Sequence, residues 1–347
     1  MRDALIDTRP REEKEKDYDH RELAFSAIPA DYTTRAKATK IAQQYLLENQ
    51  GATSSCAAHA GARCLAILAS KLSTYTRLSP SFIYRQRFNF PEQGMYVYDL
   101  GNIGRKSGAC SYDLLPTPKT EKEINAVVIT EEMRKAAEKY KGGASITINT
   151  TNIEDYANVV NNLELPVALF VWGSVKEWSK EVPEVLDSTL TLENAYVRHL
   201  VTIIPNTAHI YKKKKYVTIL DSSPFGNRYI RHVSEDYFKY RTVCGLYWLQ
   251  LTEAEKGKLP KHTFTKDLWV GCDGQDVVML QDALRALGFF TYHTSTGYYG
   301  GYTRKAVEDF QNAYANKILK AVGLSKATGY FGESTRKQLN AILNVEQ

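Results

Sequence analysis

The sequence predicts an α+β domain followed by a small bundle of three helices. Between residues 50 and 140 of the 347-residue chain, the apolar patterns are mostly helical. Between residues 145 and 250, short β-branched and aromatic runs follow one another, and after residue 267 the apolar period becomes helical again. Because a helical half is followed by a half of antiparallel strands, we expect a cleft where the two halves meet.

The individual elements follow from local composition. In the helical half, CAAHAGARCLAILASKL is rich in Ala and Leu, and EEMRKAAEKYK is a polar helix that ends at a Gly-Gly pair. The predicted strands, bounded by Pro, Gly and Asn, are ASITINT, PVALFVWG, HLVTIIP, KYVTILD and GLYWLQL. Residues 1–27 predict a charged N-terminal extension, and the polar stretch 253–266 predicts a linker. These limits give a first domain of residues 28–252 and a second of residues 267–347.

Composition narrows the function classes. The net charge of +6 favours anionic polymers, such as nucleic acid or bacterial cell wall, without selecting between them. No stretch approaches the ~20 apolar residues that cross a bilayer, and the first residues lack the apolar core of a secretory signal, so we expect neither membrane insertion nor export by a signal peptide. The five cysteines are scattered without CxxC spacing, so the sequence predicts no disulfide framework, metal site or cofactor.

The C-terminal region contains one decapeptide twice, TGYYGGYTRK at 296–305 and TGYFGESTRK at 328–337. The glycines suit tight turns, and Thr303 and Thr335 are predicted to cap the helices that follow. The helix before the first copy has four apolar residues on one face: Val277, Leu280, Leu284 and Leu287. We therefore expect a module of three helices.

This order of LQ and FQ helices, glycine turns and threonines resembles the peptidoglycan-binding domain found at an end of many cell-wall hydrolases. The resemblance covers residues 267–347 and implies bacterial peptidoglycan as a partner. We expect Tyr298, Tyr299, Tyr330 and Arg304 to contact the wall, because aromatic rings stack on sugars and guanidinium groups pair with peptide carboxylates. The alternative is that the tyrosines pack in the core, or that the module binds another partner.

The stretch QGATSSCAAHAGARCLAIL, from Gln50 to Leu68, contains the candidate nucleophile. Cys56 stands where a helix begins, so the positive end of the helix dipole favours its thiolate, and its backbone N–H can bind an oxyanion. Gln50, brought back by the turn of small residues, can donate a second hydrogen bond to that oxyanion. The alternative is that Cys56 is an inert apolar residue.

A thiol nucleophile needs a base, and the best candidate is His199 at the start of the strand HLVTIIP. Asp221, at the end of the next strand KYVTILD, can orient the imidazole if the two strands pair. His59, one helical turn after Cys56, is a rival base, but a base on the opposite wall of the cleft suits substrate access better. The alternatives are a packed core histidine at 199 and a turn-forming aspartate at 221.

Together these segments resemble the papain family of cysteine peptidases over residues 28–252. Gln50 and Cys56 match the family's oxyanion glutamine and nucleophile, and HLVTIIP matches the strand that carries the catalytic histidine, here His199. GMYVYDLGNIGRKSGACSYDLLP resembles the substrate-glycine segment, which places Gly94 where backbone pairs with an extended peptide substrate. The resemblance implies a fold of two lobes, one helical and one of antiparallel strands.

The sequence departs from this family at three positions near the site. Ala57 replaces an aromatic residue beside the nucleophile, Asp221 replaces an asparagine, and Ser223 replaces the tryptophan that shields the catalytic residues. An aspartate is chemically sound there, because it stabilises the imidazolium that forms when the thiol loses its proton.

The combination predicts a cysteine peptidase that hydrolyses amide bonds in or attached to bacterial cell wall, held there by its C-terminal module. Its expected partners are peptidoglycan and a peptide or protein substrate, not nucleic acid. By analogy, a wall enzyme without its own export signal resembles phage lysis or virion-associated enzymes. The alternatives are a general protein endopeptidase anchored on the wall, and a catalytically dead wall-binding structural protein.

Overall fold

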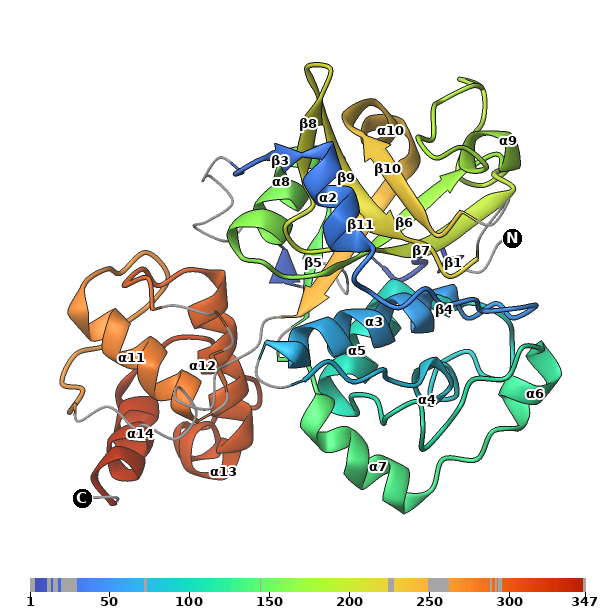
Figure 1. Cartoon of the computed structure of the whole chain (residues 1–347). Coiled ribbons are helices and arrows are strands. Elements are labelled where there is room, and N and C mark those ends of the chain that lie inside the picture. Colours follow the sequence, from blue (N-terminus) through green and yellow to red (C-terminus); the bar gives the residue numbers. More distant parts are fainter. Residues whose placement is uncertain are drawn as a thin grey trace. The chain divides into compact units, whose positions relative to one another are not determined.

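The computed structural model divides the chain into two compact units, Met1–Trp248 and Leu249–Gln347, which we call unit 1 and unit 2 and describe separately (Figure 1). The described residues are 4–10, 14, 18–19, 30–71, 74–143, 145–223, 228–248, 262–287, 289–290, 292 and 295–345. Residues 253–261 of the predicted linker and much of the predicted N-terminal extension lie outside them. Among the described residues, no helix has both the length and the apolar character that crossing a membrane requires.

The helical half of unit 1 is built around one buried helix. Its helices are α3 (Cys56–Ser70), α4 (Pro80–Tyr84), α5 (Val97–Lys106), α6 (Glu121–Ala126) and α7 (Glu131–Ala137). In α3 the first thirteen residues are buried, which its small, Ala-rich sequence allows. A Cβ added at Gly61 would lie 2.3 Å from Leu100 Cδ1, so this glycine lets α5 approach closely. The tight packing fixes the helix that begins at Cys56.

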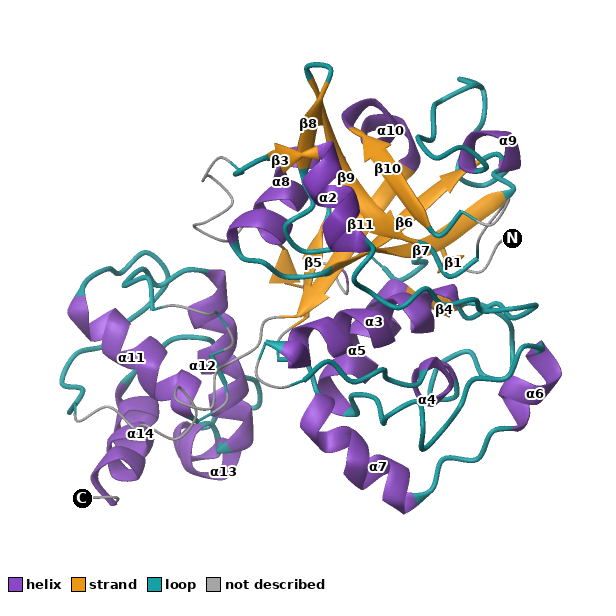
Figure 2. Ribbon diagram, viewed as in Figure 1, coloured by secondary structure: helices purple, strands orange, loops and turns teal. Residues whose placement is uncertain are grey.

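The β half of unit 1 is a sheet of nine strands within the described residues (Figure 2). They are β2 (Tyr18–Asp19), β3 (Thr33–Thr34), β5 (Ser145–Ile148), β6 (Val167–Gly173), β7 (Val197–Ile203), β8 (His209–Tyr211), β9 (Lys214–Leu220), β10 (Ile230–Ser234) and β11 (Thr242–Trp248). The order is β2-β5-β11-β6-β7-β9-β8-β3, with β10 paired to β9. The long central strands are antiparallel, and only the two-residue strands β2 and β3 pair in parallel. The predicted α+β class is confirmed.

Short helices accompany the sheet: α2 (Arg35–Ala42), α8 (Ile153–Ala157) with a π-helical turn at Asn158–Asn162, α9 (Val175–Trp178) and α10 (Glu235–Arg241). In Figure 1 the sheet and these helices form the upper part of unit 1, and α3 to α7 form the lower part. A separate two-stranded sheet pairs β1 (Ala4–Leu5) in parallel with β4 (Met95–Tyr96). The N-terminal residues therefore lie against a segment of the helical half.

Unit 2 is helical, with α11 (Gln275–Ala286), α12 (Gly301–Ala313), α13 (Ala315–Ile318) and α14 (Glu333–Val345). The three long helices contribute many of its buried apolar residues, among them Val277, Leu280, Leu284, Val307, Phe310, Leu339 and Leu343. Within the predicted linker, Phe264 is buried and packs edge-on against Phe331 at 5.1 Å between ring centroids. The described end of that segment is thus packed on unit 2.

The first decapeptide is held by a glutamine of the preceding helix. Gln281, on α11, accepts from the backbone N–H of Gly297 at 3.1 Å and donates to Tyr298 O and to Thr303 Oγ1, both at 2.9 Å. Thr303 is the third residue of α12, and the residue before this helix, Gly300, makes no side-chain cap bond. The prediction that Thr303 caps the helix is therefore wrong, because its hydroxyl accepts a hydrogen bond from Gln281 instead.

The second decapeptide repeats this arrangement. Gln311, on α12, accepts from Gly329 N at 3.1 Å and donates to Tyr330 O at 2.8 Å and to Thr335 Oγ1 at 3.0 Å. Thr335 is again the third residue of its helix. Each copy thus forms the same turn, and a buried glutamine of the preceding helix holds the backbone of that turn by hydrogen bonds.

Candidate active site

Cys56 is the first residue of α3 and is fully buried. The backbone N–H of Leu200, on β7, donates to its sulfur at 3.5 Å, which brings the helical half and the sheet together at the thiol. Because the sulfur lies at the N-terminus of a helix of 15 residues, the helix dipole favours the thiolate. The predicted position of Cys56 at a helix start therefore matches its position in the structure.

His199 lies on β7, opposite Val171 of β6, and its register places it at the buried centre of the sheet. Its Nε2 lies 2.6 Å from Asp221 Oδ1, and both side chains are completely buried. Asp221 directly follows β9, which pairs with β7, so sheet pairing brings the two residues together. The His199 ring also interacts with Cys56. Because its Nε2 is hydrogen-bonded to Asp221, the interaction with the thiol is assigned to Nδ1.

The charges of these three residues support one another. Burial alone lowers the pKa of His199, but the charges of Asp221 and Cys56 and the hydrogen bonds to both outweigh it and raise this pKa to about 10. Burial also raises the pKa of Asp221, yet the charge of His199 and the bond to it, followed by Arg231 and Ser223, outweigh burial and hold this pKa below its usual value. The geometry therefore favours an imidazolium between a carboxylate and a thiolate.

Asp221 accepts hydrogen bonds from three further groups. Ser223 N donates to Oδ1 at 2.7 Å, while Trp178 Nε1 and Arg231 Nη1 donate to Oδ2 at 2.9 and 2.6 Å. The Trp178 ring also stands edge-on to His199 at 6.2 Å between centroids. An aromatic shield is thus present although Ser223 replaces the expected tryptophan. Trp178 and Arg231 were not predicted as site residues, because neither lies in a motif near the other site residues.

Gln50 is buried and tied to the residue after Asp221. Its backbone N–H donates to Ser222 O at 2.7 Å, and its side-chain oxygen accepts from Ser222 Oγ at 2.9 Å. Its Nε2 donates to Thr53 O at 2.7 Å, within the turn that leads to Cys56. These bonds fix the turn between Gln50 and the nucleophile from both ends.

Gly94 is buried in the left-handed region of backbone space, with a φ of 82°, where glycine is favoured. Its N–H donates to Tyr84 Oη at 3.1 Å, and its carbonyl accepts from Asn89 Nδ2 at 3.2 Å. The strand β4 begins at the next residue and pairs with β1, whose first residue, Ala4, is completely buried. β1 also contacts β7, the strand of His199. The chain's own N-terminal strand thus occupies the edge that follows Gly94.

His59, the rival base, and Cys64, a second thiol of α3, lie in surroundings that differ from those of His199 and Cys56. His59 is buried, and its Nδ1 lies 3.2 Å from Ser55 Oγ and 3.1 Å from Ser55 O. Burial lowers the pKa of His59 to about 4 and raises the pKa of the Cys64 thiol to about 12. At neutral pH, His59 is uncharged and Cys64 is protonated, so this pair does not form an ion pair. Among the described residues, no group of three or more His, Cys, Asp or Glu side chains suits a metal ion.

The four residues predicted to contact the wall differ in exposure. Tyr298 and Tyr330 are 54% and 43% exposed, and Arg304 is also accessible at the surface of unit 2. Tyr299 is completely buried and donates its hydroxyl to Gly329 O at 2.9 Å, so the alternative of core packing holds for this residue. Trp269, which sequence analysis missed, is 51% exposed and stacks on Tyr330 at 6.1 Å between centroids.

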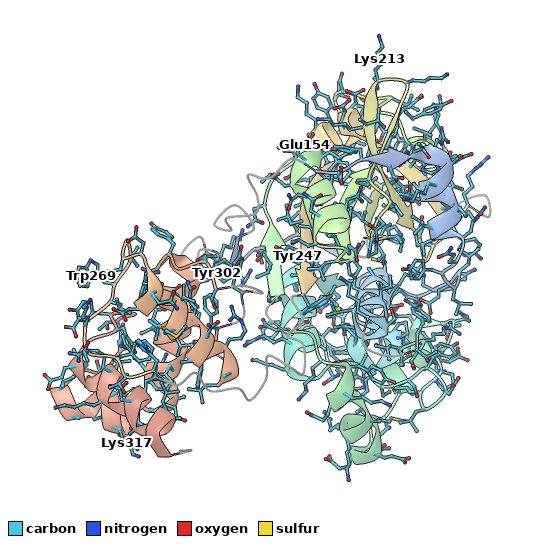
Figure 3. The ribbon with its side chains drawn as sticks, turned by 60° about the vertical axis from the view of Figure 1, so that its left-hand side comes forward. Glu154, Lys213, Tyr247, Trp269, Tyr302 and Lys317 are labelled. Atoms are coloured by element: carbon cyan, nitrogen blue, oxygen red, sulfur yellow. The ribbon has the colours of Figure 1, made fainter. Side chains whose placement is uncertain are left out.

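Figure 3 shows the Trp269 side chain at the surface of unit 2. Tyr330 Oη donates to Asp267 Oδ2 at 2.8 Å, and Asp267 also forms an ion pair with Arg336 at 2.7 Å. These contacts fix the orientation of the Tyr330 ring beside Trp269. Unit 2 thus presents a rigid pair of stacked aromatic rings with charged groups next to it.

Comparisons with known proteins agree with this architecture. The family model described as a putative peptidoglycan binding domain matches residues 273–317. Among solved structures, xylellain, a cysteine protease from Xylella fastidiosa, is similar with a TM-score of 0.55 and 14% identity, covering 71% of this chain and 95% of that chain. A procathepsin B from Trypanosoma congolense reaches a TM-score of 0.49 at 13% identity, covering 72% of this chain and 86% of that chain. The curated proteins contain no significant match.

The fold and the matched domain together define the class of this protein. The region that precedes unit 2 has the fold of papain-like cysteine proteases, an assignment that rests on the similarity to xylellain. The C-terminal region contains a peptidoglycan-binding domain at residues 273–317. The chain therefore joins a papain-like protease fold to a region that matches the model of a putative peptidoglycan binding domain.

Proposed function

We propose that this protein is a cysteine peptidase that hydrolyses amide bonds in or attached to bacterial cell wall. The observation that carries the proposal is the buried series of Cys56, His199 and Asp221, with 2.6 Å between His199 Nε2 and Asp221 Oδ1. A cysteine at a helix start, next to a histidine held by a carboxylate, is the arrangement that activates a thiol as a nucleophile. No metal or cofactor is needed for this chemistry.

In the proposed first step, the Cys56 thiolate attacks the carbonyl carbon of the scissile amide. The resulting tetrahedral oxyanion is bound by the backbone N–H of Cys56 and by the amide of Gln50. Gln50 Nε2 also donates to Thr53 O at 2.7 Å, which holds this amide beside the turn that leads to Cys56. The imidazolium of His199 then donates its proton from Nδ1 to the leaving nitrogen, the C–N bond breaks, and a thioester remains on Cys56.

The second step restores the enzyme. His199, now neutral, removes a proton from a water molecule that attacks the thioester carbonyl. The C–S bond breaks, Cys56 leaves as the thiolate, the acid product departs, and the proton taken from water stays on His199, which restores the thiolate–imidazolium pair. Asp221 keeps the imidazole in one tautomer throughout, because its Oδ1 accepts the hydrogen on Nε2 in both the neutral and the charged ring.

Unit 2 supplies the proposed contact with peptidoglycan. The exposed side chains of Trp269, Tyr298, Tyr330 and Arg304 offer aromatic rings for sugars and a guanidinium for peptide carboxylates. Binding to an insoluble polymer raises the local concentration of the peptidase at its substrate without changing the catalytic groups. Delivery by a phage lysis system or a virion is a hypothesis from sequence analogy alone.

A second candidate function is a general protein endopeptidase held on the wall. The pairing of Ala4–Leu5 with Met95–Tyr96 favours it, because an ordinary extended peptide segment already fits the edge after Gly94. The deciding experiment is mass spectrometry of the fragments released from purified sacculi and from a denatured protein, with Cys56→Ala as the control. Fragments from sacculi alone support wall hydrolysis, and fragments from the protein alone support the endopeptidase. Absence of any Cys56-dependent fragment would leave the chain as a wall-binding structural protein.

A further inference from the structure

Asp221 carries a full charge in a fully buried site, and it is shared by two cations. Oδ1 lies 2.6 Å from His199 Nε2, and Oδ2 lies 2.6 Å from Arg231 Nη1. The Arg231 side chain is also completely buried, as is the carboxylate that it contacts. A buried arginine is costly unless it is paired, so this contact calls for an explanation beyond packing.

The sheet geometry places Arg231 there by register. Arg231 pairs with Ile219 across β10 and β9, and Asp221 is two residues after Ile219 on the same chain. Because side chains alternate along a strand, residues 219, 221 and 231 share one face of the sheet. Arg231 is further held by Trp178 O, which accepts from Nε at 2.9 Å, and by Arg228 O, which accepts from Nη1 at 2.6 Å. Its guanidinium is therefore fixed against Oδ2.

We propose that Arg231 is a positioning residue that neutralises Asp221, so that the buried pair acts on His199 as a neutral hydrogen-bond acceptor does. This inference rests on the proposed function, because it assumes a thiolate–imidazolium pair at Cys56 and His199. In the family that the sequence resembles, the acceptor at this position is an uncharged asparagine. With thiolate, imidazolium and carboxylate alone the buried site would carry one net negative charge, and Arg231 returns the total to zero.

The charged and titratable groups around the acceptor are few among the described residues. Cys56 faces His199 from α3, and Arg231 faces Asp221 from β10. Arg228 and Tyr237, the latter on α10, act on Arg231 rather than directly on His199. Cys56 and Asp221 therefore act directly on His199, and Arg231 acts on it through Asp221.

The pair makes a specific prediction about single and double variants. Arg231→Gln leaves the carboxylate uncompensated, so it stabilises the imidazolium more strongly and the pKa of His199 rises. Asp221→Asn leaves a buried guanidinium near the ring, so the pKa of His199 falls. We expect shifts in opposite directions, with about three pH units for Asp221→Asn at an effective dielectric constant of about 20 and a smaller shift for Arg231→Gln, whose charge lies beyond the carboxylate. The double variant Asp221→Asn/Arg231→Gln is neutral again, so its pKa should return from that of Asp221→Asn toward the wild-type value.

The test is an NMR titration of His199 in the full chain containing isotopically labelled histidine. A His199→Gln spectrum assigns the resonance, and thermal melting of each variant reports folding. Opposite shifts in the single variants and recovery in the double variant support the inference. Shifts in the same direction, or no shift, overturn it, because a merely structural ion pair would lower stability without this pattern. If a single variant does not fold, the double variant decides: a profile like the wild type supports the neutral pair, and a displaced one overturns it.

A second measurement separates this inference from the proposed function. The ultraviolet absorbance of the Cys56 thiolate is obtained by subtracting the spectrum of Cys56→Ser from that of the wild type. A protonated thiol at neutral pH contradicts the proposed peptidase. A thiolate together with unresponsive His199 titrations contradicts only the role of Arg231.

Discussion

The N-terminal strand β1 should inhibit the proposed peptidase activity, because it occupies the backbone edge next to Gly94. Ala4–Leu5 pairs in parallel with Met95–Tyr96, and β1 also contacts β7, which carries His199. A peptide substrate that adds to the same edge must displace this strand. We therefore expect deletion of residues 1–9 to increase kcat/KM, mainly through a lower KM.

The structure gives the approximate size of the effect. Backbone pairing at the two registered positions contributes about 1 kcal/mol each, burial of the Ala4 methyl about 0.8, and the Arg9 guanidinium, 4.0 Å from the Tyr98 ring centroid, about 0.7. Ordering two residues costs roughly 2.5 kcal/mol. The remainder, about 1 kcal/mol, corresponds to about a fivefold excess of the closed form and to a similar gain on deletion.

The assay is the initial rate of cleavage of a fluorogenic peptide that the wild type hydrolyses. Ala4→Glu should have the same effect as the deletion, because the completely buried Ala4 leaves no room for a charged side chain. Thr8→Glu is the matched control, since residue 8 is exposed in the same segment. Equal kcat/KM values for the wild type, the deletion and Ala4→Glu would refute the reasoning.

Three further predictions concern thiol reactivity, wall binding and pH. In the protein without residues 1–9, iodoacetamide should modify Cys56 well before Cys64, because burial raises the pKa of the Cys64 thiol to about 12. Peptide mapping of the modified cysteines, together with the residual activity at each time point, checks this. Trp269→Ala should weaken pelleting with sacculi about tenfold, whereas Tyr299→Phe should lower unfolding free energy by about 1 kcal/mol and leave pelleting unchanged. Burial lowers the pKa of His59 to about 4, so the unfolded chain binds more protons than the folded chain between pH 6.5 and 4. Thermal stability should therefore fall as the pH is lowered from 6.5 to 4. A smaller dependence of the melting temperature on pH in His59→Gln confirms the assignment, and an equal dependence contradicts it.

The fold and the central strands could be predicted because their signals are local. The run HLVTIIP is β-branched and apolar, and it forms β7 with His199 buried on it. The small residues before Cys56 predicted a turn followed by a helix, and α3 begins at that cysteine. Pairing of β7 with β9 then brought Asp221 to His199, although the short strand β8 lies between the two in the chain.

Arg231 and Trp178 could not be predicted in the same way. Their contacts with Asp221 depend on the register of β10 against β9 and on the position of α9, which are set by tertiary packing. An arginine in a strand is usually exposed, so local sequence favoured a surface position for Arg231. The sequence also could not predict which turn residues are exposed: Tyr299 is buried, whereas its neighbour Tyr298 is exposed.

The repeated decapeptide shows why one sequence pattern gives both core and surface. In each copy the first aromatic residue is exposed and the second is buried, as for Tyr298 and Tyr299 and again for Tyr330 and Phe331. A glutamine behind each turn fixes this alternation, because it binds the backbone of the exposed tyrosine and cannot follow a shift of one residue. Only the second copy has Trp269 stacked on its exposed ring. The duplication therefore accounts for the scaffold of both turns, whereas the proposed contact with the wall includes a residue outside the repeat.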